Sequence, residues 1–179
     1  MTHGRLAELG DADARALAFR QLADHHLDAS YRLAYVILHD AHDAQDATHD
    51  AFVTAWRRWS TLRDPGAFER WFDRILVNTC RRRLRDRSRY RSSDISPDLA
   101  VTPDPQAHAV ARDLVSEAMA ILSPDHRIVL ALRYSRDLTV EQIADRLGIR
   151  AGTVKSRLHY ALRRMRDAVQ ASETGEASR

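Results

Sequence analysis

Residues 138–166 read LTVEQIADRLGIRAGTVKSRLHYALRRMR and carry the strongest fold signal in the chain. Thr139 and Gln142 have the spacing of a capping box, which predicts a short helix that begins there and ends at Gly148. A longer helix is predicted over residues 151–169. Apolar residues recur in both segments at intervals that pack two helices at a steep angle. The stretch therefore indicates a helix-turn-helix.

The second helix of this pair has a polar and strongly basic side. Residues 146–166 contain seven basic and no acidic side chains, so the positive charge is concentrated in the turn and the second helix. A helix of this width fits the major groove of DNA, with small polar residues near its N-terminus reaching bases and basic residues holding phosphates. DNA binding is therefore favoured over a merely solvated face. The polar side consists of Thr153, Lys155, Ser156, Arg157, His159, Tyr160, Arg163 and Arg164.

The whole chain has 179 residues, a formal net charge of +3 and 44% hydrophobic residues. This composition excludes wholesale disorder. The longest apolar run, residues 128–132, is far too short to span a membrane, and the N-terminus lacks an apolar signal segment, so a cytoplasmic location without membrane insertion is expected. The single cysteine, Cys80, excludes an internal disulfide framework and a cysteine-cluster zinc site. As a lone helical cysteine, it is expected to be inert core.

The net charge is unevenly distributed along the chain. Residues 1–56 carry four basic and nine acidic groups, whereas residues 57–91 carry twelve and four. Residues 92–145 again carry four and nine, and the basic helix follows. Two basic blocks separated by acidic segments predict two contacts with polyanions on one chain.

The remaining pattern predicts an all-α fold, because no stretch alternates for long at period two. Helices are expected from residue 13 to about 38, from 41 to 59, and from about 67 onward. Proline-rich and serine-rich residues then mark a boundary. Two small helical domains joined by a flexible linker are expected. The predicted parts are a loose N-terminal leader (1–12), an N-terminal domain (13–91), a linker (92–106), a helix-turn-helix domain (107–170) and a C-terminal tail (171–179).

Two N-terminal segments have different chemistry. The helix from about residue 67 combines aromatic residues with seven arginines at its end, a composition that single-stranded nucleic acid binding uses. The helix before it starts with DAQDATHDAF (43–52), and such an acidic, partly apolar face suggests a protein partner. A metal site is a weaker interpretation of the same segment, because nothing in the spacing provides a third ligand. Its candidate ligands are His39, His42, His49, Asp43, Asp46 and Asp50.

Three segments together resemble the extracytoplasmic-function (group 4) sigma factors of bacterial RNA polymerase. They are DAQDATHDAFVTAWRRW (43–59), FERWFDRILVNTCRRRLRDR (68–87) and the helix-turn-helix with the helix before it (122–166). The resemblance covers roughly residues 17–169. It implies a sigma region 2 helical bundle followed by a sigma region 4 helix-turn-helix. It also implies a non-catalytic protein without cofactor or metal, whose partners are core RNA polymerase (β′ coiled coil and β flap), promoter DNA and an anti-sigma factor.

The resemblance also assigns residues to three contacts. Core polymerase would bind Asp43, Asp46, His49, Asp50, Phe52 and Trp56. The promoter −10 element would be opened by Leu62, Trp71, Ile75, Asn78, Arg81, Arg82, Arg83 and Arg85. The −35 element would face Gly152, Thr153, Lys155, Ser156, Arg157, His159 and Tyr160. The family usually has Gln at the position of His49, often an aromatic residue at Leu62 and frequently Arg at Tyr160.

Two other functions remain as alternatives. A free-standing helix-turn-helix regulator would explain the C-terminal block but would leave the acidic and the aromatic–arginine helices without a role. A helical metal-binding domain would use the histidines. Association with core RNA polymerase distinguishes the first alternative from the sigma factor, and metal analysis tests the second.

Overall fold

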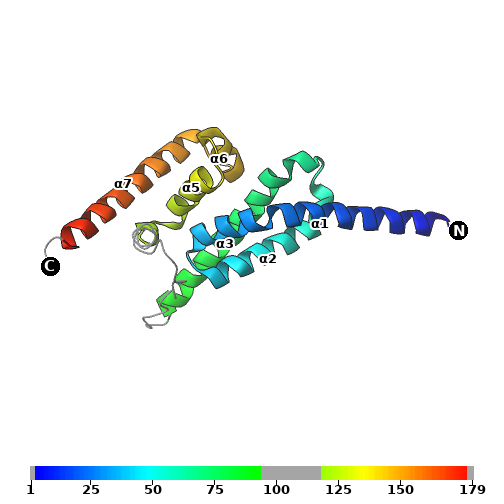
Figure 1. The fold of residues 1–179 in the computed structure, drawn as a ribbon, viewed down its shortest axis with the longest axis horizontal. Helices are drawn as coiled ribbons and strands as arrows, with labels where there is room; N and C mark the ends of the chain where they lie inside the picture. Colours follow the sequence, from blue (N-terminus) through cyan, green and yellow to red (C-terminus); the bar gives the residue numbers. More distant parts are fainter. Residues whose placement is uncertain (1–2, 94–117, 177–179) are drawn as a thin grey trace.

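The chain is described from a computed structural model that places the backbone of residues 3–93 and 118–176 and the side chains of residues 13–87, 89 and 118–171. Every regular element in these ranges is helical, which confirms the all-α prediction for the part described (Figure 1). The elements are α1 (His3–Leu38), α2 (Ala41–Arg57), the 3-10 turns η1 (Trp59–Thr61) and η2 (Pro65–Ala67), α3 (Phe68–Ser93), α5 (Pro124–Ser135), α6 (Val140–Leu147) and α7 (Ala151–Glu176).

Helices α1, α2 and α3 form an N-terminal bundle, and the start of α1 projects beyond it (Figure 1). The buried side of α2 is built almost entirely of alanines, which allows the neighbouring helices to approach closely. Helix α3 fills the centre with Phe68, Phe72 and Leu76, all nearly inaccessible to solvent. At the start of α2, the Asp40 carboxylate accepts a hydrogen bond from the backbone N–H of Asp43 at 2.8 Å and caps the helix.

Helices α5, α6 and α7 form the C-terminal half, and the predicted helix-turn-helix is present. The Thr139 side chain accepts a hydrogen bond from the Gln142 backbone at 3.2 Å, and the Gln142 side chain accepts one from the Thr139 backbone at 2.8 Å, so the capping box is complete. Gly148 ends α6 with a φ of +64°, a left-handed conformation that glycine adopts without steric cost. Interactions within a few residues of the turn, the capping box and the left-handed glycine, therefore determine where α6 begins and ends.

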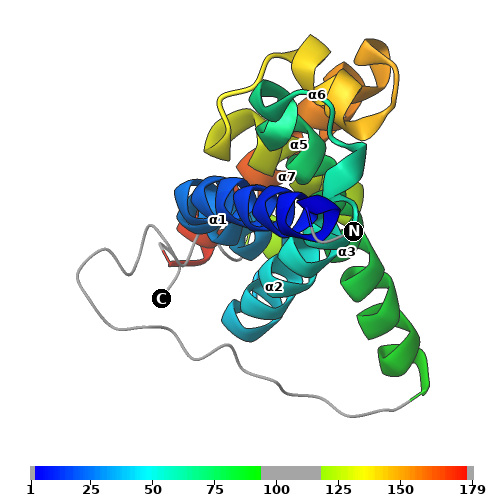
Figure 2. The same cartoon turned by 90° about the vertical axis from the view of Figure 1, so that its right-hand side faces the viewer.

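The two halves pack directly against each other. Figure 2 shows α5 and α6 stacked over the N-terminal bundle, where they contact α1 and α3. One buried apolar cluster runs from Leu33 and Phe72 in the first half to Ile128, Leu132 and Ile143 in the second. The sequence predicts two domains but gives no sign that their cores join.

Three predicted boundaries differ from the structure. Helix α7 continues to Glu176, so residues 171–176 of the predicted C-terminal tail are helical. The leader, expected to be loose over residues 1–12, is helical backbone from His3 onward, because α1 continues without a break. Helix α3 extends to Ser93, so the first two residues of the predicted linker are still helical. The rest of that linker, and residues 107–117 of the predicted helix-turn-helix domain, lie outside the described residues.

Cys80 is expected to be chemically inert in the folded protein. Its side chain is fully buried in the first half, and burial raises the pKa of the thiol to about 12. Because the reactive species is the thiolate, we expect less than one tenth of the cysteine to react with an aromatic disulfide reagent at pH 8 within an hour, against complete reaction in guanidinium chloride. Rapid reaction of the native protein would contradict this burial and support a redox role.

Candidate polymerase and nucleic-acid interfaces

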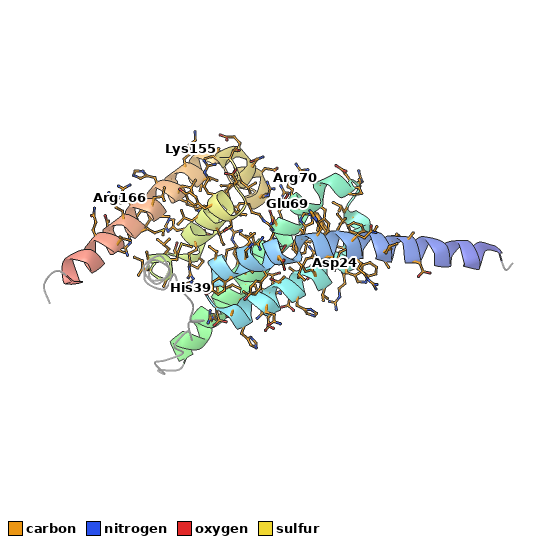
Figure 3. All side chains as sticks on the ribbon, in the orientation of Figure 1. Asp24, His39, Glu69, Arg70, Lys155 and Arg166 are labelled. Carbon is orange, nitrogen blue, oxygen red and sulfur yellow. The ribbon has the colours of Figure 1, made fainter. Side chains whose placement is uncertain are left out.

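The outer face of α7 carries most of the residues predicted to meet duplex DNA. Ile143 of α6 and Val154 of α7 are completely buried in the same apolar cluster, and Ala161 of α7 is buried in a second cluster with Leu130 of α5. This packing turns the opposite side of α7 outward, and Figure 3 shows Lys155 and Arg166 pointing away from the N-terminal bundle. The exposed members of the predicted set are Gly152, Lys155, Ser156, His159 and Tyr160.

Other members of the predicted set have partners within the protein. The Arg157 guanidinium forms a 2.6 Å ion pair with Asp125 of α5 and is largely buried. The Tyr160 ring stacks on the ring of His126, with centroids 4.7 Å apart. Burial and the charge of Arg157 lower the pKa of His126, so this imidazole is neutral at pH 7. Thr153 is half-buried, and its backbone carbonyl accepts a hydrogen bond from Ser156 at 3.0 Å.

The acidic face of α2 is held by arginines of α3. Arg83 lies within 3.4 Å of the carboxylates of Asp43, Asp46 and Asp50. Burial lowers the pKa of Arg83, but the hydrogen bond to Asp50 and the three negative charges raise it further, so the net direction is upward. Arg87 pairs in the same way with Asp40 at 3.0 Å and with Asp43 at 3.1 Å.

These ion pairs between α2 and α3 change the interpretation of the arginine run. The seven arginines at the end of this helix suggest a nucleic-acid contact, and the family resemblance assigns Arg83 to the −10 element. In the structure, Arg83 and Arg87 face α2, where four aspartates neutralise them. Arg82 and Arg85 are on the exposed side of α3. Only the exposed part of the run is therefore placed to meet a nucleic acid.

The predicted polymerase-binding residues of α2 separate into exposed and packed positions. His49 is exposed, and the side chains of Asp46 and of Asp50 retain nearly half of their accessible surface. Trp56 is 47% exposed and rests on Phe19 with centroids 5.2 Å apart. Phe52 is partly buried, and its ring packs on that of Phe72 with centroids 4.3 Å apart.

The predicted −10 residues separate in the same way. Ile75 is buried, while Leu62 and Trp71 are half-buried and pack against the core. Asn78 is exposed on α3, one turn after Arg74. Arg81 is partly buried and forms a 3.4 Å ion pair with Asp125 of the other half. The exposed residues of the predicted −10 set are thus Asn78, Arg82 and Arg85.

A cluster that the sequence analysis does not single out lies between the halves. Asp73 of α3 is completely buried, and it contacts Arg136 and Arg146 from the C-terminal half. The only available signal is an adjacent Asp and Arg within the otherwise apolar stretch WFDRILV (71–77), and this pattern does not identify the partners of Asp73.

Two further interpretations can be compared with the structure. Within the described residues, no three His, Cys, Asp or Glu side chains come together as a possible metal site. The carboxylates of the candidate set bind Arg83 and Arg87 instead. Among the same residues, no helix has the length and apolar character needed to cross a membrane.

Comparison with known proteins identifies relatives of both halves. Residues 22–90 match the family described as Sigma-70 region 2, and residues 118–167 match Sigma-70, region 4. The ECF RNA polymerase sigma factor SigL of Mycobacterium tuberculosis is 37% identical over 167 residues, which are 90% of this chain and 94% of that protein. The RNA polymerase sigma factor SigV of Bacillus subtilis is 32% identical over 152 residues, 85% and 90% of the two chains.

Solved structures share the fold. The sigma factor RpoE in complex with the anti-sigma factor NepR from Bartonella quintana aligns with a TM-score of 0.71 and 23% identity, over 85% of this chain and 96% of that one. CnrH in complex with the cytosolic domain of CnrY aligns with a TM-score of 0.63 and 24% identity, over 88% and 95%.

Proposed function

Because the chain belongs to the extracytoplasmic-function sigma factors of bacterial RNA polymerase, which direct promoter-specific initiation, we propose that α2 binds core polymerase, α3 the −10 element and α7 the −35 element. The observation that carries this division is the outward side of α7. Helix α7 is the second helix of the capped helix-turn-helix, and its outward side presents Lys155, Ser156 and His159 to solvent. Residues 146–166, which include this side, contain no acidic residue. A helix with this surface has the geometry for major-groove binding.

Docking on polymerase is proposed for the exposed part of α2. Asp46, His49 and Trp56 combine negative charge with an accessible aromatic ring, and such a surface complements a basic partner with an apolar pocket. The β′ coiled coil is the proposed partner of α2, and the β flap that of the C-terminal half. This work would take place in the cytoplasm, and the protein itself would catalyse no reaction.

Opening of the −10 element is proposed for the region around Asn78. A factor that reads unpaired bases must trap at least one of them outside the stack, at a cost of a few kcal/mol. Asn78 offers both a donor and an acceptor for a base edge, and Arg82 and Arg85 offer positive charge for the backbone. Ile75, Leu62 and Trp71 would form the apolar floor beneath it.

An anti-sigma factor is a further proposed partner, as the family resemblance implies. A free-standing regulator is not favoured, since residues 22–90 match Sigma-70 region 2 and would have no role in such a protein. The direct test is reconstitution. The purified chain should associate with core polymerase and support run-off transcription from promoters mapped by transcript profiling on overexpression. Strong binding to duplex DNA without any core association would instead support the regulator.

Replacing Lys155 and Ser156 by alanine should reduce promoter use by about 30-fold or more. Base and phosphate contacts of such residues each contribute roughly 1–3 kcal/mol. Both side chains are exposed, so the fold and core binding should be unaffected. The measurement is run-off transcription at limiting holoenzyme, with Arg32→Ala on the exposed side of α1 as the control for loss of one positive charge. Full activity of the double variant on every −35 sequence would remove α7 from promoter recognition.

A further inference from the structure

The first turn of α5 lies beside α7, the helix proposed for the −35 element, and contacts it at two positions. The His126 ring stacks on the Tyr160 ring, with centroids 4.7 Å apart and ring planes inclined by 26°. One residue earlier, Asp125 forms the 2.6 Å ion pair with Arg157. Because residues three apart in a helix are neighbours on its surface, the first turn of α5 holds one flank of α7 at two successive places.

The His126 ring is itself held in place. Its Nδ1 atom lies 2.8 Å from the hydroxyl oxygen of Ser123, the residue that precedes α5. Burial lowers the pKa of His126, so an uncharged ring faces Tyr160 at pH 7. A separate contact joins the two helices, since Leu130 of α5 and Ala161 of α7 are buried in one apolar cluster. The helices therefore remain packed together without the imidazole.

The stack leaves part of Tyr160 available for binding. The residue is 50% exposed although His126 covers one face of its ring, so the other face is open to solvent. Tyr160 follows His159 directly and lies one turn after Ser156, and both of these residues are exposed. Ordering a mobile side chain during binding costs free energy. A ring that is already stacked avoids most of this cost.

The chemistry of the ring indicates which base it can read. Among the exposed residues predicted to meet the −35 element, Tyr160 alone offers a large apolar surface. Lys155 and Arg163 offer charge for phosphates, which carry no sequence information. In the major groove, all four bases present hydrogen-bonding groups, but only thymine presents an apolar one, its C5-methyl group. An apolar ring face therefore discriminates between bases by covering this methyl group.

We propose that Tyr160 reads one thymine of the −35 element through its methyl group, and that His126 is the positioning residue that holds the ring for this contact. The inference rests on the proposed function, which places α7 in the major groove. His126 acts through Tyr160 and does not touch the base itself. The sequence alone gives His126 no role, because its partner is 34 residues away and on another helix.

Substitution of deoxyuridine for thymine tests the contact, because it removes only the methyl group. Each thymine of a mapped −35 element is replaced in turn, and run-off transcription is measured at limiting holoenzyme. At one position, the wild-type chain should use the deoxyuridine promoter about fourfold less, the effect of burying one methyl group. Tyr160→Phe keeps the ring and should keep this discrimination. Tyr160→Ala should abolish it.

Two substitutions of His126 test the positioning role. His126→Phe retains an aromatic face against Tyr160 and should retain the fourfold discrimination, whereas His126→Ala should reduce it to less than about twofold. The matched control is His25→Ala, which removes an exposed imidazole from α1 and should leave the discrimination unchanged. Circular dichroism should show wild-type helix content in every variant, because the apolar contact between α5 and α7 is retained.

Equal use of thymine and deoxyuridine promoters by the wild-type chain at every −35 position would overturn the proposal. Equal losses in Tyr160→Phe and Tyr160→Ala would also overturn it, since the hydroxyl group would then make the contact. Full discrimination in His126→Ala would remove the positioning role. Failure to associate with core polymerase would contradict the proposed function instead. The same thymine-to-deoxyuridine ratio, measured for the full chain on a duplex that it selects from a random-sequence pool, would then decide this inference.

Discussion

A variant carrying Asp46→Lys and Trp56→Ala is expected to bind core RNA polymerase about 100-fold more weakly than the wild-type chain. Trp56 is 47% exposed, and truncation of an aromatic anchor in an interface typically costs about 2 kcal/mol or more. Reversing the charge at Asp46 adds electrostatic repulsion from a basic partner surface. Together these reach about 2.7 kcal/mol, which corresponds to the stated factor.

The fold of this variant should remain intact. Arg83 loses its 3.3 Å contact with Asp46 but retains Asp43 and Asp50. Binding is measured by biolayer interferometry with immobilised core enzyme. A matched control is Asp24→Lys/Tyr31→Ala, which makes the same charge reversal and an aromatic truncation on α1. Equal core affinity of the α2 variant and the wild type would move the docking surface away from α2.

Phe72→Ala is expected to lower the free energy of unfolding of the N-terminal half by about 3–5 kcal/mol, because it leaves a large cavity. The ring is 1% exposed and packs on Phe52 at 4.3 Å and on Phe68 at 5.5 Å. All three tryptophans lie between residues 56 and 71, so intrinsic fluorescence reports on this half of the chain. Thermal melting should fall by about 10 °C or more.

Tyr160→Ala provides the contrast for this measurement. The Tyr160 ring is half-exposed on α7, where it stacks on His126, and its truncation should change the melting temperature by no more than a few degrees. If the Phe72→Ala variant melted within a few degrees of the wild type, the packing of Phe72 against Phe52 and Phe68 would not be the centre of the N-terminal core.

Much of the fold was predictable because its signals are local. The capping box at Thr139, the glycine at Gly148 and the proline that opens α5 act within a few residues of themselves. The spacing of the apolar residues in α2 and α3 likewise identifies the buried side of each helix. The leader is an exception, since it was expected to be loose, whereas α1 continues back to His3.

The candidate sites were predictable in part. Lys155, Ser156, Trp56 and Asn78 are exposed where their proposed roles need exposure. Arg83 illustrates why others were not. Its position in a basic run resembles that of Arg82 and Arg85, but the helical rotation points it at α2, where carboxylates from 33 to 40 residues away hold it. Charge in a sequence does not specify the partner that neutralises it.

The amino-acid sequence by itself determined the helical class, the helix-turn-helix and the family, because these depend on spacing within a single helix or turn. Only the tertiary structure decided which arginines remain available for nucleic acid and that Asp73 joins the two halves. Arg136 is 63 residues from Asp73, and Arg146 is 73 residues away. Such pairs form only after α3, α5 and α6 pack, since burial excludes the water that would otherwise solvate each charge.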